Sequence, residues 1–456
     1  MLGRLADGRA TLEELHRFPN MPLRAGESWH WDISALFHEV KVGLRKAAAL
    51  EIPFTSISTD SWGLDYVLFN AGGEIIPPSF HYRDPRTARG VARVHEAISP
   101  EKVFAETGLQ FMPINTLYQL AAENVERLRA AKHLVPVADA FNFMLCGVAR
   151  AEESLASTTQ LYNPRTRDWS ARLLDVLNLP SELFPPLVPS GTVLGPLQPE
   201  LARELGLPSL PVIAGCSHDT GAAVAAVPAQ GDDWAYLSSG TWSLLGAELS
   251  SPLLTEECRA CNFTNEIGYG GSVRLLKNII GLWIVQECRR AWARAGHDYD
   301  YVTLMQLAAA APPSAAWIAP DDPRFLAPGD MPETIAACCR ETGQPAPATP
   351  GAIIRCVLES LALCYARELA NLEKITGKKF TRLHILGGGS RNHLLNQFTA
   401  NALGITVFAG PVEATALGNV LVQALALGLI PSLAAARELV ANSFPLTRYE
   451  PDRLHP

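Results

Sequence analysis

Residues 382–428 carry the pattern that most narrows the fold of this chain. The segment reads RLHILGGGSRNHLLNQFTANALGITVFAGPVEATALGNVLVQALALG, in which an apolar run, three glycines, an apolar stripe at helical spacing and a second apolar run follow one another. This order predicts a strand, a glycine turn, a helix, a strand, a turn and a helix. Alternating strands and helices are typical of a sheet with parallel strands covered by helices, so we expect an α/β fold.

A second passage from strand to helix lies near the middle of the chain. LPVIAGCSHDTGAAVAAVP contains an apolar strand at 211–215, which runs into Ser-His-Asp-Thr-Gly and then into an alanine-rich helix. The polar segment PAQGDD (228–233) separates that helix from WAYLSSGTWSLLGAEL, which we predict to be a β-hairpin with a short Ser-Gly-Thr turn. We therefore expect two α/β domains with mixed sheets, 1–228 and 229–456, around a ligand-binding cleft.

Three further patterns complete the expected layout. Alternation in TLEELHRF (11–18) predicts a strand, apolar spacing over 33–50 predicts a helix, and the β-rich run at 55–60 predicts another strand. That order favours a βαβ unit with parallel strands. Longer helical patterns cover 278–295 and 351–376.

Composition excludes several classes of function. The chain has 456 residues, 48% of them apolar, and a net charge of −8, so nucleic acid is not an expected partner. It has no uncharged apolar run of about eighteen residues or more, so no membrane segment is expected. The nine cysteines are odd in number and scattered, which indicates reduced thiols and a cytoplasmic protein. We interpret Cys258 and Cys261 as unrelated thiols, and whether Cys339 and Cys356 pair is left open.

The acidic residue in Ser-His-Asp-Thr-Gly has two interpretations. Asp219 stands between a predicted strand and a predicted helix, where an isolated aspartate is most often a helix N-cap. The alternative is a catalytic base that accepts a hydroxyl proton during phosphoryl transfer, with His218 hydrogen-bonding the same substrate.

Two small-residue turns have the chemistry to bind phosphate or nucleotide. Ser238 to Thr241 offer hydroxyls and closely spaced N–H groups, although a plain hairpin turn explains them as well. Gly387 to Gly389 would let a nucleotide come close to the backbone, and they stand just before a predicted helix, whose amino end favours anions. The alternative is a tight turn between strand and helix, which accounts for one or two of the three glycines. Neither G-x-x-x-x-G-K-[ST] nor G-x-G-x-x-G occurs, so this is not an obvious P-loop or dinucleotide-binding protein.

Taken together, ordered segments along nearly the whole chain resemble the FGGY carbohydrate kinases. They are STDSWGLDYVLF, HYRDPRT, INTLYQL, STTQLYNP, SHDTGAAV, YLSSGTWSLLGAE, NFTNE, RLLKNIIGLWIVQE, LGGGSRNHLLNQ and AGPVEATALGN. The resemblance implies an actin-like ATPase fold, in which two RNase H-like domains flank a catalytic cleft. It also implies transfer of the γ-phosphate of ATP, with Mg2+, to the 1-hydroxyl of L-rhamnulose. The alternatives are another sugar of the family, L-fuculose or xylulose, or a non-catalytic binder of sugar or nucleotide.

The resemblance also implies roles for seven residues and a simple set of partners. Asp219 is implied as the base, Gly63 and His218 as sugar contacts, and Thr241, Asn278, Gln286 and Gly388 as nucleotide contacts. The expected partners are the sugar and ATP, with a monomer or weak homo-oligomer as the assembly.

The N-terminus departs from the family pattern. FGGY kinases ordinarily open with a strand followed by an Asp-x-Gly-x-x-Ser-like phosphate loop, and no such motif lies upstream of the strand predicted at 11–18. We expect the natural protein to begin further upstream, and the alternative is a truncated product.

Overall fold

The computed structural model describes residues 1–452, and the chain divides into two compact units. Each unit is assembled from three separate segments. The first comprises Met1–Pro228, Glu248–Leu275 and Thr415–Ser443, and the second comprises Ala229–Ala247, Leu276–Ala414 and the residues from Phe444 onward.

The first unit contains mainly short strands and helices. Its strands are β1 (Leu2–Ala6), β2 (Arg9–Glu13), β3 (Leu23–Ala25), β4 (Ser28–Trp31), β5 (Ile57–Ser58), β6 (Tyr66–Phe69), β7 (Ser79–Phe80), β8 (His133–Pro136), β9 (Ala151–Glu152), β10 (Tyr162–Asn163), β11 (Asp168–Trp169), β12 (Leu187–Val188), β13 (Thr192–Pro196), β14 (Pro211–Ala214) and β17 (Thr264–Ile267). Its helices are α1 (Ile33–Ala48), α2 (Thr87–Ala97), α3 (Pro100–Thr107), α4 (Thr116–Ala121), α5 (Val125–Ala130), α6 (Val137–Cys146), α7 (Glu153–Ala156), α8 (Ala171–Leu177), α9 (Pro199–Leu205), α10 (Asp219–Ala225), α11 (Glu256–Ala260), α17 (Ala414–Ala426) and α18 (Leu433–Ser443).

The second unit is built on one mixed sheet. Its strands are β15 (Trp234–Ser239), β16 (Trp242–Leu249), β19 (Arg382–Leu386), β20 (Thr406–Ala409), β21 (Thr447–Tyr449) and the later part of β18 (Val273–Ile280), which starts in the first unit. Its helices are α12 (Trp283–Arg294), α13 (Tyr301–Ala310), α14 (Met331–Glu341), α15 (Pro350–Thr376) and α16 (His393–Leu403).

The sheet of the second unit confirms the predicted mixture of strand directions. The strand order in this sheet is β17-β18-β16-β15-β19-β20-β21, in which β15, β19 and β20 run parallel, while β16 pairs antiparallel with β15 and β21 pairs antiparallel with β20. The hairpin predicted at WAYLSSGTWSLLGAEL is β15 and β16, with Ser239 opposite Ser243. The long helix predicted at 351–376 is α15, whereas the helix predicted from 278 begins only at Trp283 because 278–280 complete β18.

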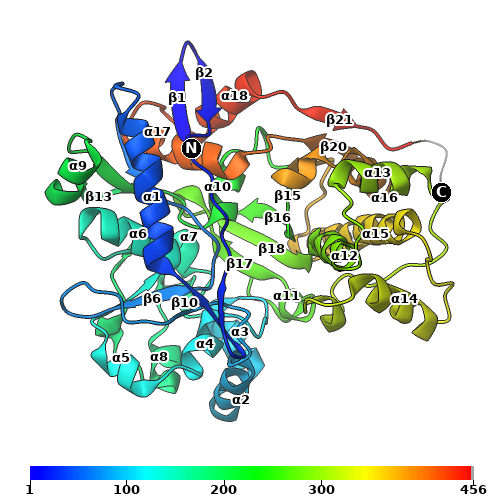
Figure 1. Cartoon of the computed structure of the whole chain (residues 1–456), viewed down its shortest axis with the longest axis horizontal. Helices are drawn as coiled ribbons and strands as arrows, with labels where there is room; N and C mark the ends of the chain where they lie inside the picture. Colours follow the sequence, from blue (N-terminus) through cyan, green and yellow to red (C-terminus); the bar gives the residue numbers. More distant parts are fainter. Residues whose placement is uncertain (453–456) are drawn as a thin grey trace. The chain divides into compact units, whose positions relative to one another are not determined.

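The βαβ unit predicted near the N-terminus is wrong. The strand expected at 11–18 is β2, which pairs antiparallel with β1 as the blue hairpin of Figure 1. Helix α1 forms as expected, with the side chain of Asp32 capping the N–H of Ala35. The strand that follows it, β5, pairs parallel with β14. Alternation signals a half-buried strand but does not identify its partner, which explains the error.

Strands β5 and β14 bring two loops of the first unit together. Their parallel pairing continues beyond the strand ends as a bridge between Ser61 and His218. The N–H of Ser61 donates to the carbonyl of Ser217 at 2.9 Å, and the N–H of Asp219 donates to the carbonyl of Ser61 at 2.9 Å. Segments 60–63 and 217–219 therefore lie side by side at the carboxyl ends of two strands, where open α/β sheets bind ligands.

Helix α17 completes the first unit although it comes near the end of the chain. A Cβ on Gly418 would lie only 1.7 Å from the carbonyl oxygen of Ala222, so α17 and α10 cross with their backbones in close approach. The hydroxyl of Thr415 donates to the carbonyl of Asp219 at 3.2 Å. Val422 packs in one apolar cluster with Ala222 and its neighbours in the chain. The last part of the first unit thus holds the helix that begins at Asp219.

Among residues 1–452, no helix is long and apolar enough to cross a membrane.

Candidate active site

Asp219 is the first residue of α10, and its carboxylate is not used to cap the helix. The N-cap residue is His218, whose side chain makes no capping hydrogen bond. The Asp219 side chain is 43% exposed, and its Oδ1 accepts a hydrogen bond from the hydroxyl of Thr220 at 3.1 Å. The N-cap interpretation is therefore wrong, and this carboxylate is accessible at the amino end of a helix, where the helix dipole favours an anion.

His218 lies between Asp219 and a buried ion pair. Its Nε2 is 3.4 Å from Oδ1 of Asp219. Its Nδ1 is 3.1 Å from Nη2 of Arg274 and 3.3 Å from Oε2 of Glu266. Glu266 belongs to β17 and Arg274 to β18. The sequence analysis assigned no role to either residue. A charged residue inside an apolar strand such as VRLLKNII could have indicated a buried charge that needs a partner.

Two buried carboxyl groups support the loop beneath His218. Oε2 of Glu152 accepts the N–H of Ser217 at 2.9 Å, and Oδ1 of Asp139 accepts the hydroxyl of Ser217 at 2.7 Å. The hydroxyl of Ser154 accepts the N–H of His218 at 3.1 Å. Burial, and then the charge of Glu152, raise the pKa of Asp139 to about 8. Asp139 therefore keeps its proton near neutral pH, which reduces the repulsion between these two carboxyl groups.

Asp60 supplies a second carboxyl group on the neighbouring loop. Its Oδ2 accepts a hydrogen bond from the amide of Asn419, on α17, at 2.6 Å. Burial raises the pKa of Asp60 to about 6, although the hydrogen bond from Asn419 lowers it, and the charge of Asp219 adds to the increase. Asp60 and Asp219 are thus close enough to influence each other electrostatically.

Gly63 follows in the same loop, and the structure gives a packing reason for the glycine. A Cβ at this position would lie 2.8 Å from Oγ1 of Thr158. Next to it, the indole of Trp62 donates to the carboxylate of Asp65 at 2.8 Å, and burial raises the pKa of Asp65 to about 7. The loop is therefore closely packed, and the contact of Gly63 with a sugar stays a prediction.

In the second unit, the structure brings Thr241 and Gln286 together. The side-chain amide of Gln286 donates to Oγ1 of Thr241 at 3.2 Å. The carbonyl of Thr241 accepts the N–H groups of Gly281 and Trp283, which ties the hairpin turn to the start of α12. Asn278 is half-buried in β18, three residues before Gly281.

The three glycines after β19 differ in what the fold demands of them. Gly387 has a φ of +79°, a value that favours glycine, and a Cβ on Gly389 would lie 2.0 Å from Oγ of Ser239. A Cβ on Gly388 would meet nothing within 4 Å. The turn therefore requires two of its glycines for conformation and packing, and Gly388 borders open space.

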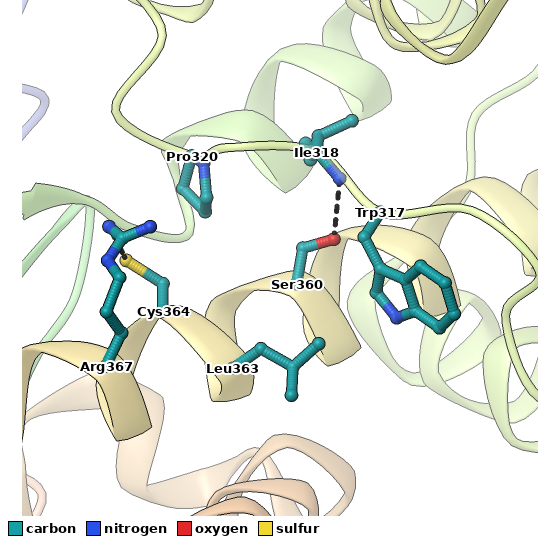
Figure 2. A pocket seen from close by; sticks show the side chains of 7 residues that line it. All are labelled: Trp317, Ile318, Pro320, Ser360, Leu363, Cys364 and Arg367. Carbon is teal, nitrogen blue, oxygen red and sulfur yellow. Dashed lines mark hydrogen bonds between the residues drawn. The ribbon is translucent and has the colours of Figure 1, made fainter. Parts of the chain in front are cut away.

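A pocket of about 260 Å³ also lies in the second unit, along α15 (Figure 2). Its lining is Trp317, Ile318, Pro320, Ser360, Leu363, Cys364 and Arg367. In Figure 2, the hydroxyl of Ser360 accepts the N–H of Ile318, at 3.0 Å, so part of the polar lining is already paired. None of the seven residues with implied roles lines this pocket.

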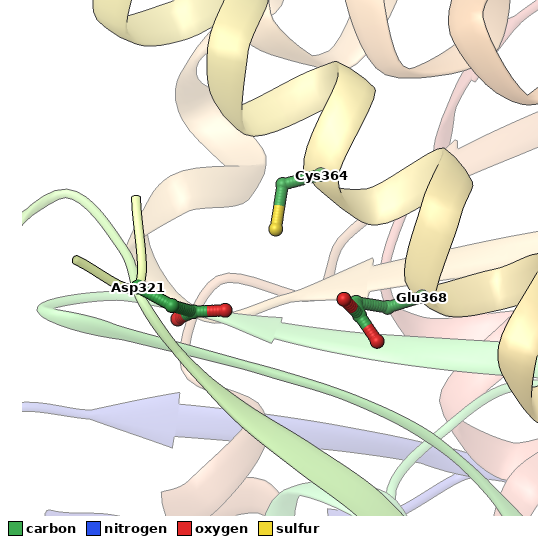
Figure 3. Close-up of side chains that lie close together, drawn as sticks. All are labelled: Asp321, Cys364 and Glu368. Carbon is green, nitrogen blue, oxygen red and sulfur yellow. The ribbon is translucent and has the colours of Figure 1, made fainter. Parts of the chain in front are cut away.

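Asp321, Cys364 and Glu368 lie close together in the same unit (Figure 3). The carboxylate of Glu368 already accepts hydrogen bonds from Lys277 at 3.1 Å and Arg367 at 2.7 Å. Burial raises the pKa of Cys364 to about 12, so its sulfur is a thiol and not the thiolate that binds metals. We therefore interpret this cluster as an ion-pair network.

The nine cysteines are free thiols in the structure, Cys339 and Cys356 included.

Comparisons with known proteins agree over nearly the whole chain. The description "FGGY family of carbohydrate kinases" applies to two matches, the N-terminal domain over residues 7–226 and the C-terminal domain over residues 235–427. A rhamnulokinase of Enterococcus faecalis is 43% identical over 98% of this chain and 90% of its own length. A rhamnulokinase of Bacteroides thetaiotaomicron is also 43% identical, over 99% of this chain and 93% of its own length.

Solved structures of sugar kinases share the fold. A ligand-bound xylulose kinase from Lactobacillus acidophilus superposes with a TM-score of 0.79 at 18% identity, over 98% of this chain and 90% of that one. A glycerol kinase from Plasmodium falciparum, with ADP, gives a TM-score of 0.76 at 13% identity, over 97% and 89%. The fold is therefore the two-domain, actin-like α/β fold expected from the sequence. With both domains matched and relatives similar over nearly their full length, this chain belongs to the FGGY family of carbohydrate kinases.

Proposed function

We propose that this protein is a rhamnulokinase, which transfers the γ-phosphate of ATP to the 1-hydroxyl of L-rhamnulose. The observation that carries the proposal is the accessible carboxylate of Asp219, beside His218 and at the amino end of α10. The name and the 43% identity of the two relatives support the choice of sugar.

The first unit is proposed to bind the sugar. Asp219 accepts the proton of the attacking hydroxyl, while His218 and the loop at Gly63 hydrogen-bond the sugar. Support comes from the backbone pairing of segments 60–63 and 217–219, which converge at the ends of β5 and β14. A general base must lie within hydrogen-bonding reach of the proton that it accepts, and an exposed carboxylate at a strand end meets this need.

The second unit is proposed to bind ATP. The open space at Gly388 fits a nucleotide close to the backbone, and the turn holding Thr241 and Gln286 offers hydroxyl, amide and N–H groups for phosphates. Asn278 is assigned to the same site. We thus propose that the domain expected at 1–228 binds the sugar and that the domain expected at 229–456 binds the nucleotide. Each domain includes the further segments that complete its unit.

Mg2+ is proposed to enter with the ATP phosphates. When bound, it neutralises charge that develops on the transferred phosphoryl group. Mg2+ is commonly held by substrate phosphates together with one or two carboxylates.

The remaining proposals concern the cellular compartment and the oligomeric state. Nine free thiols and the use of ATP fit the reducing cytoplasm, and we propose a monomer or a weak homo-oligomer there.

One experiment tests the activity and the sugar together. ADP release is followed with L-rhamnulose, L-fuculose and xylulose at the same ATP and Mg2+ concentrations, and the product is examined by 31P and 13C NMR. We expect the highest kcat/KM with L-rhamnulose and phosphate on its C1 oxygen. A higher kcat/KM with either other sugar would assign the chain to that substrate. Calorimetric binding of ATP and sugar without turnover would identify a non-catalytic binder.

A further inference from the structure

We propose that Arg274 and Glu266 are positioning residues, which fix the ring of His218 with its proton on Nε2 and direct that N–H toward Asp219 and the sugar. This inference deepens the proposed function, on which its catalytic consequence rests. The tautomer itself belongs to the unliganded protein and can be measured without turnover.

The donor chemistry of arginine determines the tautomer. The Nη2 of Arg274 lies 3.1 Å from Nδ1 of His218 in hydrogen-bonding geometry. A guanidinium group has only N–H donors, so Nδ1 must accept. A neutral imidazole carries one proton, and when Nδ1 accepts, that proton is on Nε2. A proton on Nδ1 would instead set two donors against each other.

Glu266 holds the arginine in place. Its Oε2 is 3.0 Å from Nη2 of Arg274 and 3.3 Å from Nδ1 of His218. The shorter distance joins the two fully charged groups, which is the stronger interaction. A second contact fixes the same guanidinium, because its Nε donates to the carbonyl of Ile267 at 3.3 Å.

Burial makes the arrangement rigid. The side chains of Arg274, Glu266 and His218 are 0%, 6% and 9% exposed. Burial acts to raise the pKa of Glu266, but the charge of Arg274 and the contact with His218 outweigh it, so the pKa lies below its usual value. Glu266 therefore remains a carboxylate that neutralises Arg274. A buried arginine of this kind is stable only while it is paired.

The opposite side of the ring faces the base. Nε2 of His218 is 3.4 Å from Oδ1 of Asp219, on the accessible side of the loop. With its proton there, His218 donates a hydrogen bond to a sugar oxygen next to the reactive hydroxyl. That bond orients the sugar and leaves the hydroxyl proton for Asp219. The Nδ1–H tautomer would present a lone pair to the carboxylate of Asp219 instead.

Nitrogen NMR of the full-length protein tests the tautomer directly. The protein is labelled with 15N-histidine, and two-bond 1H–15N correlations distinguish protonated from unprotonated ring nitrogens. The His218 signals are identified by their loss in His218→Gln. We expect protonated Nε2 and bare Nδ1 near neutral pH. A proton on Nδ1, or a doubly protonated ring, would overturn the proposal.

Substitutions then test the cause. In Arg274→Met, we expect the His218 signals to shift toward the Nδ1–H form, because Glu266 becomes the only partner of Nδ1. Arg86→Met is the matched control, since Arg86 is also a buried arginine of the first unit, paired with Glu123 at 3.2 Å, and it should leave the His218 signals unchanged. If Arg274→Met does not fold, the double variant Arg274→Met/Glu266→Gln removes the buried charge as well. An unchanged tautomer in the folded variant would contradict the role of Arg274.

Kinetics separate a positioning role from a structural one. Arg274→Met should raise KM for L-rhamnulose at least about 10-fold and lower kcat, while KM for ATP stays within about 2-fold; one hydrogen bond to a charged group corresponds to roughly this range. Arg274→Lys, which keeps a donor, should recover part of the loss. Equal changes in both KM values would indicate a general structural effect and contradict the proposal. A wild-type protein with the Nε2–H tautomer but no sugar kinase activity would overturn the proposed function alone.

Discussion

At the scale of single residues, the carboxylate of Asp219 is the group that we propose as the base in phosphoryl transfer. We expect Asp219→Asn to bind ATP and L-rhamnulose with affinities close to wild type, because the amide has the same shape. Turnover should fall by about 10²- to 10⁴-fold, the usual contribution of general base catalysis. Calorimetry and ADP release on one preparation measure the two effects. Asp232→Asn is the control, since that side chain is 89% exposed, and near-normal turnover of Asp219→Asn would remove Asp219 from the role.

The glycine turn after β19 allows a sharp comparison between neighbours. A methyl group at Gly388 meets open space, so Gly388→Ala should keep the wild-type Tm and raise KM for ATP several-fold. Gly389→Ala should lower stability by roughly 1–3 kcal/mol, because its Cβ would overlap Oγ of Ser239. Thermal unfolding and ATP titration of the two variants check both expectations. An unchanged KM for ATP in Gly388→Ala would show that ATP does not bind against this turn.

Residue-level prediction from the sequence depended on neighbours along the chain. His218 and Asp219 could be proposed as site residues because they stand together in one motif after an apolar strand. Arg274 was not, because it lies 56 positions from the histidine that it contacts, and only the strand topology brings the two together. Buried partners such as Asp139 were missed for the same reason, since an acidic residue in the first turn of a helix has an ordinary explanation in the helix dipole.

At the scale of elements, the crossing of α10 and α17 is the contact most sensitive to size. A Cβ on Gly418 would overlap the carbonyl of Ala222, and backbone cannot move aside as a side chain can. We expect Gly418→Ala to lower the free energy of unfolding by about 1–3 kcal/mol or more and to weaken sugar binding, because Asn419 would shift away from Asp60.

Urea unfolding and a sugar titration measure both effects of Gly418→Ala. Gly329→Ala is the control, since a Cβ there meets nothing within 4 Å. A Gly418→Ala protein as stable as this control would show that the two helices separate easily.

Helices and strands were predictable from the sequence where their hydrogen-bonding partners lie within the same short segment. The hairpin of β15 and β16 contains both of its strands, and the 27-residue helix α15 forms its own hydrogen bonds, so both were found from sequence. The partner of β5 could not be found, because β14 lies far along the chain and two-residue strands have weak patterns. The helix predicted at 278 began late because the apolar end of β18 satisfies a helical pattern equally well.

At the scale of the whole molecule, buried carboxyl groups couple stability to pH. The folded protein keeps a proton on Asp139 up to a pKa of about 8, whereas the unfolded chain releases it near the ordinary aspartate value of about 4. Its contribution to stability is therefore complete below pH ~4 and is lost as the pH rises through ~8. Each unit of difference in pKa corresponds to about 1.4 kcal/mol.

Asp139→Asn isolates this coupling. The asparagine cannot titrate, and its amide can still bond the hydroxyl of Ser217 and the N–H of Glu152. We expect the free energy of unfolding of the variant, relative to wild type, to increase steadily between pH 5 and pH 8, as measured by urea unfolding at several pH values. Parallel pH profiles for the two proteins would mean that Asp139 is already ionised in the folded state.

The interleaved segments of the two units predict how the protein responds to cutting. Residues 1–228 form most of the first unit but lack Glu248–Leu275 and Thr415–Ser443, and with them Glu266, Arg274 and Gly418. We expect a fragment ending at Pro228 to show no cooperative thermal transition, because cluster residues such as Ala222 lose their packing against α17. Circular dichroism of the fragment beside the full chain checks this, and a sharp transition in the fragment would contradict it.

Helix α17 also sets the order of events during synthesis. The ribosome makes the loop of Asp60 first, Asp219 later, and the Asn419 that pairs with Asp60 some two hundred residues after Asp219. Until then Asp60 lacks its amide partner and α10 lacks the helix that crosses it. The proposed sugar site can therefore assemble in full only after the ribosome has made the α17 segment, long after its first loop.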